Sequence, residues 1–84
     1  MTINVTAQNN NRRVRFNVDS STTIGEVLDI AADNEVIFGN AGIMMGRTTL
    51  MESDMNKTLE DFGYTGEPGR ETVSLLGVER KNNA

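Results

Sequence analysis

Apolar and polar side chains alternate strictly in two segments near the start of the chain. Side chains of a strand point to its two faces in turn, so this pattern predicts two half-buried strands. The polar run Gln8–Asn11 between the segments contains asparagines, which tolerate the positive φ of a tight hairpin turn. The segments are residues 2–7 and 13–18, and their apolar members are Ile3, Val5, Ala7, Val14, Phe16 and Val18.

The apolar spacing then changes to that of a helix. Thr23, with Glu26 three residues later, matches the capping box that begins a helix. Asn34 is a suitable C-terminal stop, so we predict a helix of about 11 residues whose apolar face packs on the hairpin. The residues of that face are Ile24, Val27, Leu28 and Ala31.

The middle of the chain carries a weaker pattern. The apolar triplet 36–38 fits either a short strand or a loop that plugs the core, and residues 39–42 are typical of a turn. Residues 43–45 are predicted to form a third strand. A tight turn at 46–47 then joins it to a short return strand over 48–51.

The clearest break in the sequence is Thr65–Gly69, which contains the only proline. We predict a single helical turn before it, over residues 57–62. After it, residues 71–78 are apolar at both odd and even positions, which predicts a strand buried on both faces and therefore central in its sheet. Residues 1–79 are predicted to form one domain, followed by a polar tail over 80–84.

Two stretches, together with the N-terminal strand, resemble the ubiquitin-like β-grasp family. Residues 14–18 followed by Thr22–Val27 resemble the second strand of these proteins and the start of their helix. Thr58–Tyr64 resembles the Thr-Leu-x-Asp-Tyr/Phe-Gly/Asn-Ile stretch before their last strand. The resemblance implies that Leu59 enters the core beneath the helix and that Gly63 bends the backbone.

The resemblance also implies a fold. It is of the α+β class, a β-grasp with a mixed sheet of four to five strands and one helix packed across it. The first and last strands pair in parallel at the centre. A parallel pair needs a crossover connection, which the helix and the middle strands supply.

The composition removes most catalytic chemistry from consideration. The chain has 84 residues, no histidine and no cysteine, which excludes imidazole and thiol chemistry and disulfides. A domain of this length is also too small to enclose a deep pocket. We therefore expect no enzymatic activity, no cofactor and no metal. Four acidic residues fit a solvated loop better than a cation site: Glu52, Asp54, Glu60 and Asp61.

The charge balance disfavours two classes of partner. A net charge of −4 opposes generic binding to nucleic acid and to anionic membranes, and no apolar run is long enough to span a bilayer. The lack of a signal-peptide pattern and of cysteine favours a cytoplasmic location. One basic cluster stands in the hairpin, at Arg12, Arg13 and Arg15. It fits contact with phosphates or an acidic partner, or a solvated strand that discourages edge pairing.

The end of the sequence departs from the family pattern. Ubiquitin and the similar sulfur-carrier proteins end in Gly-Gly on a flexible tail, where activating enzymes act. Here the sequence ends in Glu79–Ala84, and Gly77 falls inside the predicted last strand. The resemblance therefore implies a ubiquitin-like protein without the reactive tail, similar to small bacterial or phage accessory proteins of this fold.

We expect an adaptor or accessory module that binds another protein. Ile43 is expected near the position of the apolar recognition patch of ubiquitin, and methionines adapt to irregular contacts, although they equally fill a loosely packed core. Two other functions stay open: a modifier or sulfur carrier activated at its C-terminus, and a nucleic-acid-binding accessory protein that uses the hairpin arginines. The expected protein-binding residues are Ile43, Met44, Met45, Arg12, Arg13, Arg15 and Arg47.

Overall fold

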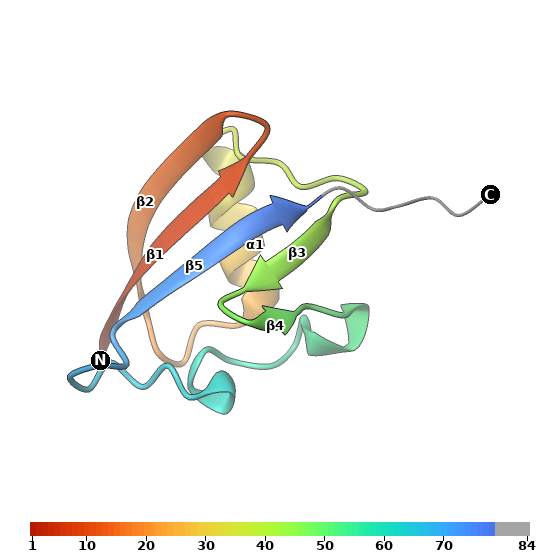
Figure 1. Cartoon of the computed structure of the whole chain (residues 1–84). Coiled ribbons are helices and arrows are strands. Elements are labelled where there is room, and N and C mark those ends of the chain that lie inside the picture. Colours follow the sequence, from red (N-terminus) through yellow and green to blue (C-terminus); the bar gives the residue numbers. More distant parts are fainter. Residues whose placement is uncertain (79–84) are drawn as a thin grey trace.

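The computed structural model of the chain describes residues 1–78. Within them lie strands, one α-helix that packs behind the sheet, and two 3₁₀ turns (Figure 1). The predicted tail over 80–84 lies outside the described residues. The elements in chain order are β1 (Thr2–Asn9), β2 (Arg12–Asp19), α1 (Ile24–Asp33), β3 (Gly42–Met45), β4 (Thr48–Thr49), η1 (Glu52–Asp54), η2 (Glu60–Phe62) and β5 (Thr72–Val78).

The strands form one mixed sheet in the order β2-β1-β5-β3-β4. β1 and β5 pair in parallel at its centre, with Val5 beside Val73, and the neighbouring pairs are antiparallel. Helix α1 covers one face, and the other face is uncovered (Figure 1). This architecture confirms the predicted α+β sheet and the parallel pairing of its first and last strands.

The hairpin of β1 and β2 forms as the alternation predicts. Asn10 and Asn11 take φ values of 49° and 67°, the left-handed conformation that a two-residue turn between twisted strands requires. Val5 lies opposite Phe16 in the resulting register. The apolar members of β1 are fully buried, whereas those of the edge strand β2 are half-buried.

The capping box at the start of α1 is also confirmed. The Glu26 backbone N–H donates to Thr23 Oγ1 at 3.2 Å, and the Thr23 N–H donates back to Glu26 Oε1 at 3.2 Å. Asn34 is the C-cap residue, and its side chain donates to the Ile30 carbonyl at 2.8 Å. Ile24, with the other buried residues of this face, packs on the sheet.

Of the two alternatives for residues 36–38, the core-plugging loop is the one observed. Val36 and Phe38 are 1% and 8% exposed, and Ile37 between them is 65% exposed. The predicted return strand is shorter than expected, because only Thr48–Thr49 pair with β3. Beyond them the Leu50 side chain turns into the core.

The segment before the last strand takes the role that the resemblance implies. Leu59 is 0% exposed, and its neighbour Thr58 forms a β-bridge with the cap residue Thr23. Gly63 has φ 93°, so the backbone bends there as expected. Phe62 and Tyr64 are half-buried against the core.

The prediction that β5 is buried on both faces is wrong. Val73 and Leu75 are 5% and 1% exposed, but Leu76 is 46% exposed. The sheet carries a helix on one face only, so a residue of the opposite parity in its central strand meets solvent. The predicted central position of the strand is nevertheless confirmed.

Candidate functional site

The face of the sheet opposite α1, here called the open face, is covered by no other element of residues 1–78 (Figure 1). Alternation assigns its residues, because those of opposite parity are buried under α1. Most of its side chains are polar. From β2, β1 and β5 these polar residues are Arg13, Arg15, Asn17, Asp19, Thr2, Asn4, Thr6, Gln8, Thr72 and Ser74.

An apolar pair interrupts this polar face. Leu76 of β5 lies opposite Met44 of β3 in the strand register; Leu76 is exposed, and Met44 is half-buried and keeps part of its surface in solvent. On its other side Leu76 is beside Gln8, which is itself paired with Arg13. The Met44 sulfur accepts a hydrogen bond from Thr49 Oγ1 at 3.0 Å. The two side chains therefore form an accessible apolar pair, bordered by an amide and a guanidinium.

Only part of the predicted Ile/Met patch lies at the surface. Met45 is 1% exposed and belongs to the core, so its expected place in an exposed patch is wrong. Ile43 has the same parity and is half-buried against the core, whereas Met44 lies on the open face. Parity explains the difference, because neighbouring residues of a strand cannot share a face.

The structure separates the predicted arginines into three places. Arg12 forms a surface ion pair with Glu35, at 2.9 Å between Nη1 and Oε2. Arg13 and Arg15 lie on the open face and form no ion pair with any residue of 1–78. Arg47 is exposed in the turn between β3 and β4, and β1 and β5 separate it from the hairpin arginines.

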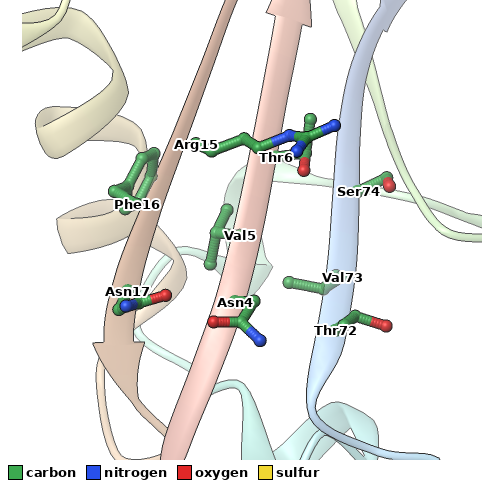
Figure 2. A pocket seen from close by; sticks show the side chains of 9 residues that line it. All are labelled: Asn4, Val5, Thr6, Arg15, Phe16, Asn17, Thr72, Val73 and Ser74. Atoms are coloured by element: carbon green, nitrogen blue, oxygen red, sulfur yellow. The ribbon is translucent and has the colours of Figure 1, made fainter.

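Beside the apolar pair, the open face is hollowed into a shallow groove of about 510 Å³. Figure 2 shows Arg15 reaching from β2 across β1, above Thr6 and toward Ser74 of β5. Among residues 1–78 no carboxylate lines the groove, and Arg15 supplies the only charge there. The residues lining it are Asn4, Val5, Thr6, Arg15, Phe16, Asn17, Thr72, Val73 and Ser74.

The sequence analysis named Arg15 but did not single out Leu76 or the other polar residues that line this groove. The signal for the lining was present, because these residues are the polar members of the same alternating segments that predicted the strands. Leu76 had no such signal, since Leu75 precedes it and either one fits the core. Only the single helix layer decides which of the two faces outward.

Solved structures resemble this one along the whole chain. A protein described as Caldiarchaeum subterraneum ubiquitin has a TM-score of 0.64 and 12% identity, with 100% of both chains covered. A ubiquitin-like protein from Trypanosoma brucei has a TM-score of 0.63 and 21% identity, with 94% of this chain and 95% of that chain covered. The protein has the ubiquitin-like β-grasp fold. No protein-family model matches the sequence, and no curated protein matches it significantly.

In this ubiquitin-like fold Gly77 has a packing role. A Cβ at this position would lie 2.2 Å from Oδ1 of Asn9 in the neighbouring strand, which is far inside van der Waals contact. Asn9 is itself 8% exposed, and its Nδ2 donates to the Ile37 carbonyl at 2.7 Å. Gly77 is therefore the residue that lets β5 pass beside Asn9, and it lies within the sheet.

Two of the four acidic loop residues, Asp54 and Asp61, accept hydrogen bonds from backbone N–H groups. The Asp54 carboxylate accepts from the Met51 N–H at 2.8 Å and from Lys57 Nζ at 3.0 Å, and these bonds hold its pKa below the ordinary value. Asp61 accepts from the Thr58 N–H at 2.9 Å, which lowers its pKa likewise. Each carboxylate thus accepts from a backbone N–H three residues before it, at the start of a short helical turn.

Residues 1–78 offer neither a metal-binding cluster nor a membrane-spanning helix. No group of three or more histidine, cysteine or acidic side chains is arranged there to hold a metal ion. Among the described helices, none has the length and apolar character needed to cross a membrane.

Proposed function

We propose that this ubiquitin-like protein is a small non-enzymatic adaptor or accessory module that binds another protein through the open face of its sheet. The apolar pair Leu76 and Met44 is the centre of this docking surface, and Arg13 and Arg15 are its charged border. Of the other residues expected from the sequence, Ile43 supports the face from the core side. Arg12 and Arg47 lie outside it.

The observation that carries this proposal is the exposure of Leu76 in the middle of the sheet. A central strand is the place where a domain most readily buries an apolar side chain, yet 46% of this residue is accessible. Its cross-strand neighbour Met44 is also accessible, and methionine suits adaptable protein contacts. An accessible apolar centre with a polar rim is the usual anatomy of a protein interface.

The competing role of a C-terminally activated modifier has less support. Gly77 lies inside β5 and packs against Asn9, so this glycine does not provide the free glycine tail on which such a role depends. Within residues 1–78, a nucleic-acid role has only Arg13 and Arg15 on the open face to support it. The Phe16 side chain belongs to the helix side of the sheet, so no described aromatic side chain stands beside them on the open face.

Affinity capture with matched variants tests the proposal. We expect immobilised wild-type protein to retain a partner from the lysate of its source cells, and Leu76→Glu to lose that partner, because a charge then sits at the apolar centre. Ile37→Glu is the matched control, since Ile37 is 65% exposed but lies in the loop after α1. Equal capture by all three proteins, or capture by none, would contradict the proposal.

A further inference from the structure

β2 is an edge strand of the sheet, and its outer side pairs with no other residue of 1–78. The opposite edge is closed in part by the short strand β4, whereas β2 is 8 residues long. In Figure 1 no loop or helix of the described part of the chain, residues 1–78, runs along the outer side of β2. A long unpaired edge presents a row of backbone donors and acceptors to another strand.

In the hairpin of β1 and β2, hydrogen-bonded and non-hydrogen-bonded residue pairs alternate. This alternation decides which residues of β2 direct their backbone N–H and C=O groups to the outer side. The two-residue turn makes Asn9 and Arg12 a hydrogen-bonded pair, and hydrogen-bonded pairs then alternate along the hairpin. The Ser20 N–H donates to the Met1 carbonyl at 2.9 Å, in the same phase. Arg13, Arg15 and Asn17 therefore direct their backbone N–H and C=O groups outward, as does Asp19.

The side chains of these outward residues have an unequal charge distribution. Arg13 and Arg15 stand at the hairpin end of β2, and Asp19 stands at the other end. A strand with cations at one end and a carboxylate at the other is complementary to an antiparallel copy of itself. The Asp19 side chain is 56% exposed, so it remains accessible although it already accepts from the N-terminal amine.

The charges also select a register. Antiparallel pairing about a two-fold axis at Val14 or at Arg15 would place arginine opposite arginine. An axis at Phe16 places Arg13 opposite Asp19 and Arg15 opposite Asn17, each of them twice. An axis at Asn17 also opposes unlike charges but pairs a shorter length of strand. The axis at Phe16 therefore combines unlike charges with the longest overlap.

We propose that two copies of this chain associate through β2 in this register and so form one continuous sheet. The partner of this edge is thus a second copy of the chain. On the helix side of the sheet, Phe16 would face Phe16 and Val14 would face Val18. All three residues are only half-buried in the single chain, so the contact gives their remaining apolar surface a partner.

The proposed dimer would affect how a partner binds to the open face, but the dimer does not require that a partner binds there. A two-fold axis perpendicular to the sheet places both open faces on the same side of the dimer. A partner with two matching sites would then bind with increased avidity. The dimer contact itself uses only the edge, so it stands even where the open face binds nothing.

Sedimentation of the purified chain tests the inference. The protein concentration should reach about 1 mM, where weak association is measurable, and the salt concentration should be about 0.15 M. We expect a monomer–dimer equilibrium that Arg13→Asp and Asp19→Arg each weaken at least about tenfold. The double variant R13D/D19R restores opposite charges across the axis and should recover the wild-type constant. Arg70→Glu, a charge reversal away from β2, should leave it unchanged.

A variant that removes one backbone N–H from the outer edge of β2 tests the inference even if Asp19→Arg fails to fold. Asn17→Pro removes an N–H that points outward and leaves the ladder to β1 intact, so it should fold and remain monomeric. Hydrogen exchange should show the N–H groups of Arg13, Arg15 and Asn17 becoming protected as the wild-type concentration rises.

Three results would overturn the inference. They are a wild-type chain that stays monomeric throughout, a dimer that survives both Arg13→Asp and Asn17→Pro, and folded single variants whose combination fails to restore association. Leu76→Glu separates this inference from the proposed function. It should abolish partner capture and leave the dimer constant unchanged.

Discussion

The contact between Asn9 and Gly77 shows how a side chain of β1 determines which residue can stand beside it in β5, the adjacent strand of the sheet. Asn9 is buried, and its amide donates to the carbonyl of Ile37, the middle residue of the core-plugging loop. The space beside it is available only because β5 carries no Cβ at Gly77. A polar bond between a strand and a loop thus requires a glycine in a strand, where glycine is otherwise unfavourable.

Gly77→Ala is therefore expected to lower the free energy of unfolding by about 1–3 kcal/mol, because the new methyl group must displace the Asn9 amide and loosen its bond. Urea denaturation measures the change. In the double variant N9A/G77A the two nearest amide atoms are removed and only the Cβ of residue 9, at 3.1 Å, stays close, so most of the added cost of the Gly77 substitution should disappear. An effect of G77A below about 0.5 kcal/mol would contradict this account.

Among the elements, the segment that includes η2 is a structural support for the helix. Leu59 is fully buried, and backbone bonds tie the segment to the start of α1: the Leu59 N–H donates to Thr22 O at 3.1 Å and the Ile24 N–H donates to Lys57 O at 2.9 Å. The sequence motif that contains Leu59 thus supports the core and the start of α1.

Leu59→Ala and Leu76→Ala form a matched test of these two environments. Removing the buried side chain should cost about 2–5 kcal/mol of unfolding free energy, because a cavity remains under the helix. Removing the exposed one should cost less than about 1 kcal/mol. Thermal or urea unfolding of both variants gives the comparison. Similar losses at the two positions would show that Leu76 is not a surface residue of the folded chain.

The elements that were predictable from the sequence are those stabilised by residues close to one another along the chain. The hairpin follows from alternation and two asparagines, and α1 follows from its capping box, because the residues that stabilise these features are close along the chain. η1 was not predicted, and β4 was predicted too long. The Leu50 N–H donates to Ile43 O at 2.9 Å, so this part of the chain is held by pairing with β3, which no short pattern reports.

The candidate site was less predictable than the fold for the same reason. Arg13 and Arg15 were identified because alternation places them on the solvent side of a strand. Met45 was assigned to the wrong face, and Leu76 was assigned to the core. Whether each of these residues faces the helix or the solvent depends on the register of its strand, and only the complete sheet establishes that register.

At the scale of the whole molecule, several carboxylates contribute to stability in the same direction. The pKa values of Asp19, Glu26, Asp54 and Asp61 are all lowered, mainly because each accepts hydrogen bonds from a nearby hydroxyl or backbone N–H. A lowered pKa in the folded state means that the stabilisation is complete above the ordinary values of 3.8 and 4.5. It is lost as the pH falls through the lowered values.

We therefore expect the melting temperature to be level above about pH 5 and to fall steadily in more acidic buffer. Glu26→Gln should be less stable than wild type at neutral pH and should show a smaller acid-dependent loss. Calorimetry across this range makes the comparison. A wild-type melting temperature that rises on acidification would contradict the assigned sign.

The groove in Figure 2 takes its walls from β1, β2 and β5, which belong to opposite ends of the chain. These walls meet only after the parallel pairing of β1 with β5 has closed the long loop between them, a step with a high entropic cost. An unfolded or prematurely shortened copy therefore has no such surface to offer. A ligand of this groove would select intact molecules, and by mass action it would shift the folding equilibrium toward them.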